Sequence, residues 1–310
     1  MFSKISLLTH CQKKSKNTAF SIVEISVVIL IISLLLAGIL NGTSLIGDAS
    51  VATAQKLTTN ADVNNMESLT LWLETSFTSS LEAQGNKKVE NDIKINRWKD
   101  NSPLKSPTKR FDFIQTASTN QPTYKEDVID GLPMLYFTTS NSLEFFSSTS
   151  TLTQEKQNQN LSLADLMQNN QATIFIVCMF DKLASGTKLI NFNNVVNFGY
   201  NANKIEMIFD GNNLIESADS LKTETLQMIS AIKNIGKIEF YLNGNLRSNI
   251  SSSATIVDTN FSSNFSSTNK ITVGGFKGWL GEILVFNTAL ATKERQQVEQ
   301  YLTKKWKIKK

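Results

Sequence analysis

The feature that most constrains this chain is an apolar run near its N-terminus, FSIVEISVVILIISLLLAGIL at residues 20–40. At 1.5 Å per residue, a helix of this run is roughly 31 Å long, which matches a hydrocarbon core of about 30 Å. Lysines precede the run and none follows it closely, so the positive-inside rule places the N-terminus in the cytoplasm. The run therefore predicts one transmembrane helix over residues 20–40, with the following chain outside the cytoplasm.

The helical pattern continues past the apolar run. Leu45, Ala49, Ala52 and Leu57 recur at helical spacing, and no proline interrupts them. A secretory signal peptide has a shorter apolar region that ends at a small-x-small cleavage site. The sequence therefore favours a long helix over residues 20–65 rather than a removed signal.

The basic charge of the chain is concentrated before this helix. The formal net charge is +4, and the segment before residue 19 carries Lys4, Lys13, Lys14 and Lys16 with no acidic residue. Removing these four of the 31 basic residues leaves 27, which equals the 27 acidic residues. The basic charge therefore belongs to the leader and gives no indication of a nucleic-acid partner.

Glu24 is the one charged residue in the apolar run. Insertion of a carboxylate near the bilayer centre costs about 2.5–3.5 kcal/mol on insertion scales. A residue with this cost is therefore a candidate for a functional role in which it pairs with a partner group. A buried carboxylate becomes tolerable when a cation meets it.

The stretch AFSIVE at residues 19–24, followed by an aliphatic run, resembles the prepilin-type cleavage and methylation segment of type IV pilin-like proteins. The resemblance implies a leader over residues 1–19 that a prepilin peptidase cuts between Ala19 and Phe20. It also implies N-methylation of Phe20, and pairing of Glu24 with the terminal amine of a neighbouring pilin subunit during assembly. The family prefers glycine where this chain has Ala19, and an uncleaved signal anchor is the alternative.

From about residue 66 the pattern changes to short runs rich in β-branched and aromatic residues. Turn residues separate these runs, and Asn243-Gly244 is a strong hairpin signal. Many antiparallel strands in one chain indicate a sandwich or jelly roll. The runs are LWLET at 71–75, KRFDFI at 109–114, PMLYFT at 133–138, SLEFF at 142–146, TIFIVCMF at 173–180, VVNFGY at 195–200, KIEMIFD at 204–210, LQMISAI at 226–232, KIEFYLNG at 237–244, KITVGGF at 270–276 and WLGEILVFN at 279–287.

The chain ends in a pattern of helical period. In residues 292–306, Val298, Leu302 and Trp306 fall on one face, and Arg295 and Glu299 can pair one turn apart. This predicts a C-terminal amphipathic helix, whose basic tail of lysines at 304, 305, 307, 309 and 310 indicates a solvated helix end.

Several of these pieces, in order along residues 69–307, resemble the laminin-G-like, concanavalin A-like family. They include LWLE at 71–74, WKDNS at 98–102, GWLGEI at 278–283 and ERQQVEQYL at 294–302. The resemblance implies a jelly-roll β-sandwich over residues 66–310. The expected fold class is mainly β with a long N-terminal helix: a transmembrane pilin-type α-helix, a concanavalin A-like sandwich and a short C-terminal helix.

Residues that carry catalysis are scarce in this chain. His10, the single histidine, lies in the leader, which argues against Ser-His-Asp, Cys-His and histidine-zinc chemistry. Glycoside hydrolysis needs two carboxyls about 5–10 Å apart, which on one strand means a pattern such as E-x-D-x-E, and none appears. Glu126, Asp127 and Asp130 form the densest acidic cluster, which is typical of a solvated turn and a weak candidate for calcium. We therefore expect no enzyme activity and no cofactor other than, at most, calcium.

The functional hypothesis is a pilin-like or pseudopilin subunit of a type IV pilus or type II secretion-like filament. Its expected partners are a prepilin peptidase, other pilin subunits, inner-membrane lipid, and a surface glycan or protein ligand of the sandwich. The expected location is the inner (cytoplasmic) membrane, single-pass with a cytoplasmic N-terminus, and then a cell-surface filament. The alternatives are an uncleaved membrane-anchored lectin-like domain and a structural minor pilin with no ligand.

Overall fold

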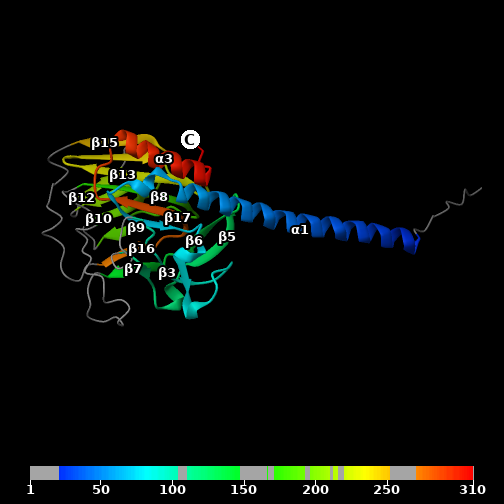
Figure 1. The fold of residues 1–310 in the computed structure, drawn as a ribbon. Coiled ribbons are helices and arrows are strands. Elements are labelled where there is room, and N and C mark those ends of the chain that lie inside the picture. The colour runs from blue at the N-terminus through cyan, green and yellow to red at the C-terminus, as the bar shows by residue number, and fades with distance from the viewer. Residues whose placement is uncertain are drawn as a thin grey trace, which may run out of the picture. The chain divides into compact units, whose positions relative to one another are not determined.

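The computed structural model describes residues 21–103, 110–146, 166, 171–192, 196–209, 212–215, 220–251 and 270–309. It divides into two compact units, Met1–Ile46 and Gly47–Lys310. Within the described residues, the second unit is a sandwich of two antiparallel sheets (Figure 1), here called sheet A and sheet B. Most of two polar segments, residues 147–170 and 250–269, lies outside the described residues.

Sheet A has the strand order β15-β14-β13-β8-β17-β6-β5, and β1 pairs with β17 beside this path. Its central strand β8 reads ATIFIVCMF, an unbroken apolar run, because both of its faces are buried. The strands are β1 (Leu69–Glu74), β5 (Thr123–Ile129), β6 (Leu132–Phe137), β8 (Ala172–Phe180), β13 (Gln227–Asn234), β14 (Lys237–Leu242), β15 (Asn245–Ser251) and β17 (Gly278–Phe286).

Sheet B has the order β12-β11-β10-β9-β16-β7-β4-β3-β2. Gly199 of β10 is required by a close approach, since a Cβ there would lie 2.1 Å from the carbonyl oxygen of Thr187 in the neighbouring strand. The strands are β2 (Leu81–Ala83), β3 (Ile95–Trp98), β4 (Phe113–Ile114), β7 (Ser142–Phe146), β9 (Thr187–Phe192), β10 (Val196–Asn201), β11 (Lys204–Phe209), β12 (Asn212–Ile215) and β16 (Lys270–Gly274).

Among the described residues, the α-helices lie towards the two ends of the chain, with short 3-10 turns between them. The long helix is α1 (Ile22–Thr59), and the C-terminal helix α3 (Thr292–Trp306) begins and ends where the sequence predicts it. The 3-10 turns are η1 (Asp62–Asn65), η2 (Thr78–Ser80), η3 (Gln84–Asn86) and η5 (Ser118–Asn120).

The expected transmembrane pilin-type helix requires correction. Among the residues that the structure describes, no helix is long and apolar enough to cross a membrane. Glu24, Ser26 and Ser33 place polar groups among the apolar side chains of α1. The fold class predicted with a transmembrane helix is therefore wrong, and the described chain is mainly a β-sandwich.

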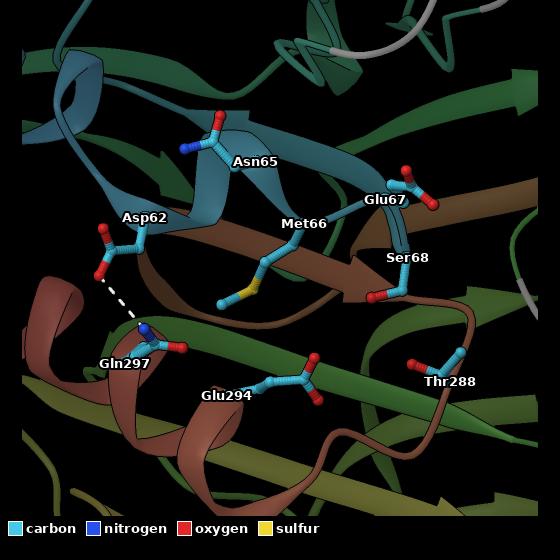
Figure 2. Close-up of a pocket in the computed structure, with 8 residues that line it drawn as sticks. All are labelled: Asp62, Asn65, Met66, Glu67, Ser68, Thr288, Glu294 and Gln297. Carbon is cyan, nitrogen blue, oxygen red and sulfur yellow. Dashed lines mark hydrogen bonds between the residues drawn. The ribbon is translucent and has the colours of Figure 1, made fainter.

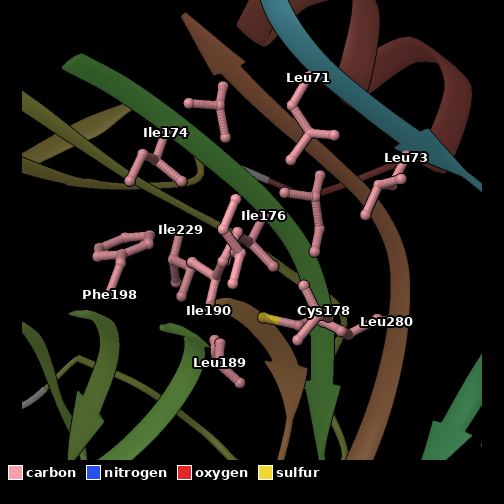
Figure 3. Packing of buried hydrophobic residues seen from close by; sticks show 14 of the residues in the cluster. Leu71, Leu73, Ile174, Ile176, Cys178, Leu189, Ile190, Phe198, Ile229 and Leu280 are labelled. Carbon is pink, nitrogen blue, oxygen red and sulfur yellow. The ribbon is translucent and has the colours of Figure 1, made fainter. Parts of the chain in front are cut away.

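Two layers of apolar packing hold the second unit together. The first fills the space between the sheets, where alternate residues of β8, Ile174, Ile176 and Cys178, point inward (Figure 3). The second lies between the outer face of sheet A and α3, where Val298, Leu302 and other apolar residues pack against Phe175 and Val177 of β8. Ala54, in the last part of α1, belongs to the same layer.

Cys178 is an inert core residue in this arrangement. Its side chain is fully buried among Ile176, Leu189 and Leu280, and burial raises the pKa of its thiol. We therefore expect iodoacetamide to leave Cys178 unmodified in the folded protein and to alkylate it after unfolding in urea. Peptide mass mapping reads each site separately, and rapid alkylation of Cys178 in the native protein would contradict its buried position.

Candidate functional site

The predicted assembly site lies at the start of α1. Ala19 and Phe20, the predicted cleavage and methylation positions, lie outside the described residues. Glu24 is in the first helical turn, where its Oε2 accepts a hydrogen bond of 2.9 Å from the Ser21 backbone N–H. A carboxylate at this end of a helix is stabilised by the helix dipole. It is also exposed in the isolated chain, so it is accessible to a cation from a partner.

The helix that follows Glu24 presents apolar side chains to its surroundings. Their exposed fractions run from 48% at Val27 to 86% at Ile22, which leaves them uncovered within a single chain. Water contact with so many apolar groups is unfavourable, at roughly 25 cal/mol per Å². We call the segment at residues 22–36 the apolar segment. Its exposed members are Ile22, Val23, Ile25, Val27, Val28, Ile29, Leu30, Ile31, Ile32, Leu34, Leu35 and Leu36.

The predicted acidic cluster lies partly in β5, which contains Glu126 and Asp127, and partly in the turn that begins at Asp130 and leads to β6, so the predicted turn position is correct for Asp130 alone. Asp127 and Asp130 adopt positive φ angles of 49° and 50°, and Asp127 Oδ1 accepts a hydrogen bond of 2.9 Å from the Gly131 N–H. The Glu126 N–H donates to Asn91 Oδ1 at 3.1 Å. In the described part of the chain, no group of three or more His, Cys, Asp or Glu side chains is arranged to hold a metal ion.

Gly131, the second residue of this turn, explains part of the turn's conformation. Its φ is +81°, and a Cβ there would lie 2.9 Å from Cβ of Ser50 in α1. The turn therefore serves as a close packing contact for the last part of α1.

A groove that the sequence did not indicate lies between η1 and the start of α3 (Figure 2). It has a volume of about 590 Å³ and a largely polar lining. Two of its acidic residues already serve the fold, since Gln297 Nε2 donates to Asp62 Oδ2 at 3.3 Å and Glu294 Oε2 accepts from the Ala291 N–H at 3.0 Å. The lining residues are Asp62, Asn65, Met66, Glu67, Ser68, Thr288, Glu294 and Gln297.

A buried ionic cluster is the most unusual group of side chains in the second unit. Lys305 Nζ lies 3.0 Å from Glu74 Oε2 and 2.9 Å from Glu282 Oε2, and all three side chains have no exposed surface. The predicted solvated position for Lys305 is therefore wrong, because the last turn of α3 directs this side chain onto sheet A. The neighbouring Lys304 and Lys307 are exposed.

Hydrogen bonds from aromatic side chains complete this cluster. Glu282 Oε1 accepts bonds of 2.7 Å from both Trp72 Nε1 and Tyr301 OH, and Glu282 Oε2 accepts one of 2.7 Å from Trp306 Nε1. The Tyr301 hydroxyl also lies 3.0 Å from Thr58 Oγ1 in the last turn of α1. The cluster therefore ties α1, β1, β17 and α3 together at one point.

The charges within this cluster stabilise one another. Burial by itself raises the pKa of a carboxyl, but the Lys305 ammonium and the Ser76 donors outweigh it and hold the pKa of Glu74 below its ordinary value. Burial likewise lowers the pKa of an amine, yet Glu282 and Glu74 raise the pKa of Lys305 above its ordinary value. Glu74 and Lys305 are therefore both charged at neutral pH, which suits a structural clamp better than proton transfer.

The segment WKDNS at residues 98–102 also has a structural role. Asp100 is fully buried, and its Oδ1 accepts hydrogen bonds of 3.0 Å from the backbone N–H groups of Trp72 and Ser102. Its Oδ2 accepts one of 3.1 Å from the Phe111 N–H. Asp100 therefore joins three chain segments through their backbones.

Comparison with known proteins gives structural similarity alone. The sequence matches no family model, and it matches no curated protein. The botulinum neurotoxin serotype D/C binding domain is similar at a TM-score of 0.45 and 14% identity, over 78% of this chain and 53% of that one. The chain thus spans about half the length of the toxin domain.

Two other similar structures are connected with sialidases. The Ruminococcus gnavus IT-sialidase CBM40, bound to α2,3-sialyllactose, has a TM-score of 0.36 and 14% identity, over 42% of this chain and 83% of that one. The Trypanosoma rangeli sialidase, in complex with the inhibitor DANA, has a TM-score of 0.45 and 11% identity, over 74% of this chain and 32% of that one. At TM-scores below 0.5, these similarities carry no argument about what this chain binds.

Proposed function

We propose that the chain is a pilin-like subunit that assembles with copies of itself or related subunits and displays its β-sandwich on the cell surface as a binding domain. The observation that supports assembly is the apolar segment, whose large side chains are about half exposed or more. Packing such segments against one another in a filament removes them from water. The second half of the proposal is that the sandwich, displayed on the cell surface, acts as the binding domain in adhesion.

Glu24 supplies the specificity of this assembly. Cleavage between Ala19 and Phe20 by a prepilin peptidase creates a terminal amine four residues before Glu24 on each subunit. An ammonium group of a neighbouring subunit pairs with the Glu24 carboxylate, so that neither charge is left alone among apolar side chains. This role rests on the likeness of residues 19–24 to the prepilin segment, together with the position of Glu24 at the start of the apolar segment.

The intact mass and N-terminal sequence of the chain, co-expressed with a prepilin peptidase, test the proposal directly. We expect a chain that starts at N-methylated Phe20. A matched culture without the peptidase is expected to give a chain that starts at Met1. A Met1 start in both cultures would contradict processing at Ala19, and would favour an uncleaved surface-anchored domain.

A further inference from the structure

Two aromatic side chains lie side by side on the outer face of sheet A. Tyr136 of β6 is opposite Trp279 of β17, with 4.6 Å between the ring centroids and 52° between the ring planes. Their chain neighbours Leu135 and Leu280 point into the core between the sheets. The alternation of a strand therefore directs both rings away from that core.

The strand register extends this pair into a row across four strands. Thr123 of β5 is opposite Tyr136, and Met179 of β8 is opposite Trp279. All four side chains are half-buried. We call Thr123, Tyr136, Trp279 and Met179 the aromatic row.

Trp279 differs from the other tryptophans of the chain. Trp72, Trp98 and Trp306 are at most 1% exposed, and each donates its indole N–H to a buried acceptor. Trp279 is the one of the four whose ring stays partly open to solvent. A half-buried tryptophan beside a half-buried tyrosine on an open sheet face indicates a binding surface, since both residue types are enriched in binding hot spots.

A carboxylate borders the aromatic row. The Tyr136 hydroxyl donates a hydrogen bond of 2.8 Å to Asp181 Oδ2, and Asp181 directly follows β8. The bond orients the Tyr136 ring and the carboxylate together. An ionised carboxylate accepts about four hydrogen bonds, so Asp181 retains the capacity to accept from a ligand hydroxyl.

We propose that the aromatic row and Asp181 form a binding site for a hexopyranose ring of an oligosaccharide. The apolar C–H face of the sugar stacks against the Trp279 and Tyr136 rings, whose faces carry negative partial charge. A hydroxyl at the edge of the sugar donates to Asp181, a charge-assisted hydrogen bond. This inference rests on the binding half of the proposed function and identifies its ligand class.

The size of the site favours a sugar over a protein. A stable protein interface takes about 20–30 residues on each side. The aromatic row offers four side chains and one carboxylate, far fewer groups than a protein interface requires. Ring stacking with hydrogen bonds at the rim also suits a flat ligand that is apolar on its face and polar at its edge.

Glycan-array screening of the full-length chain in detergent, followed by titration of the strongest oligosaccharide, tests this proposal. We expect binding to at least one hexopyranose oligosaccharide, with a shift in tryptophan fluorescence on titration. Trp279→Ala and Tyr136→Ala are each expected to weaken binding by roughly tenfold or more, as for other aromatic anchors. Trp279→Phe, which keeps a ring for stacking, is expected to restore most of the affinity.

Two controls separate loss of the site from loss of the fold. Phe77→Ala removes another half-buried aromatic, at the start of η2, and is expected to leave binding unchanged. The urea unfolding midpoint of each variant is also measured, and a midpoint equal to that of the parent protein shows that the fold is retained. Absence of binding across the array, or equal binding by the parent and both alanine variants, would overturn the proposal. Cleavage at Ala19 and filament formation are measured without any glycan, so their failure is distinguishable from failure of this site.

Discussion

Replacing Lys305 with methionine is expected to lower the free energy of unfolding by about 3–5 kcal/mol, a large share of the stability of an ordinary domain. Methionine approximately keeps the length of the side chain but removes the charge that lies 3.0 Å from Glu74 and 2.9 Å from Glu282. Two carboxylates are then buried without a cation. Urea unfolding followed by tryptophan fluorescence measures the change, because Trp72 and Trp306 both donate to Glu282.

The adjacent lysine provides a matched control for this prediction. Lys304 is exposed, so Lys304→Met is expected to change stability by less than about 0.5 kcal/mol. The difference in free energy of unfolding between Lys305→Met and the parent protein is expected to narrow as the pH falls, because protonation neutralises the two unpaired carboxylates of the variant. The parent protein itself is expected to lose stability on acidification. The lowered pKa of Glu74 stabilises the fold at pH values above the pKa of this group in the unfolded chain, and this contribution is lost as the pH falls through the pKa of the folded state. Equal stability of the two methionine variants would contradict the ionic clamp.

Replacing Glu24 with glutamine is expected to abolish filament formation while leaving synthesis and cleavage of the subunit intact. Glutamine keeps the shape of the side chain and an oxygen that accepts from the Ser21 N–H, so the change isolates the charge. Without that charge, the ammonium of a neighbouring subunit enters an apolar environment unpaired, which is strongly unfavourable. The measurement is the amount of sheared filament from cells that carry a type IV assembly system, followed by electron microscopy.

Asp48→Asn is the matched control, because Asp48 is an exposed acidic residue further along the same helix. We expect this variant to assemble like the parent. Filaments from Glu24→Gln in parent amounts would remove Glu24 from the assembly mechanism. Filaments absent from both variants but present for the parent would show that charge anywhere on α1 matters, which also contradicts a specific pair at Glu24.

Most of the strands could be predicted from the sequence because they bury residues on at least one face. The run at 173–180 is β8, which begins one residue earlier, and the run at 279–287 is β17, which begins and ends one residue earlier. Asn243-Gly244 does form the turn between β14 and β15, with φ angles of 51° and 80°. The strands that were missed include β2 and β12, which are short edge strands, and β5, β9 and β15, which are longer but contain frequent polar residues.

The positions of individual charged side chains follow less directly from the sequence. Arg295 and Glu299 do pair one turn apart, as their spacing predicts, with Arg295 also lying 4.2 Å above the Tyr241 ring. Lys305, by contrast, belongs to a basic tail in the sequence and to a buried cluster in the fold. Helical spacing places Lys305 relative to Tyr301 and Trp306, but it contains no information on which sheet residues lie beneath that turn.

The sequence by itself determined the β-sandwich class, the C-terminal helix and the apolar N-terminal segment, because these follow from local periodicity and composition. Only the tertiary structure decided that Glu74, Glu282 and Lys305 meet in one buried cluster, and that Tyr136 and Trp279 lie side by side in one row. The physical reason is the same in both cases. These residues come from segments far apart in the chain, and their contact depends on which strands pair and in which register, a choice made by the packing of the whole sandwich.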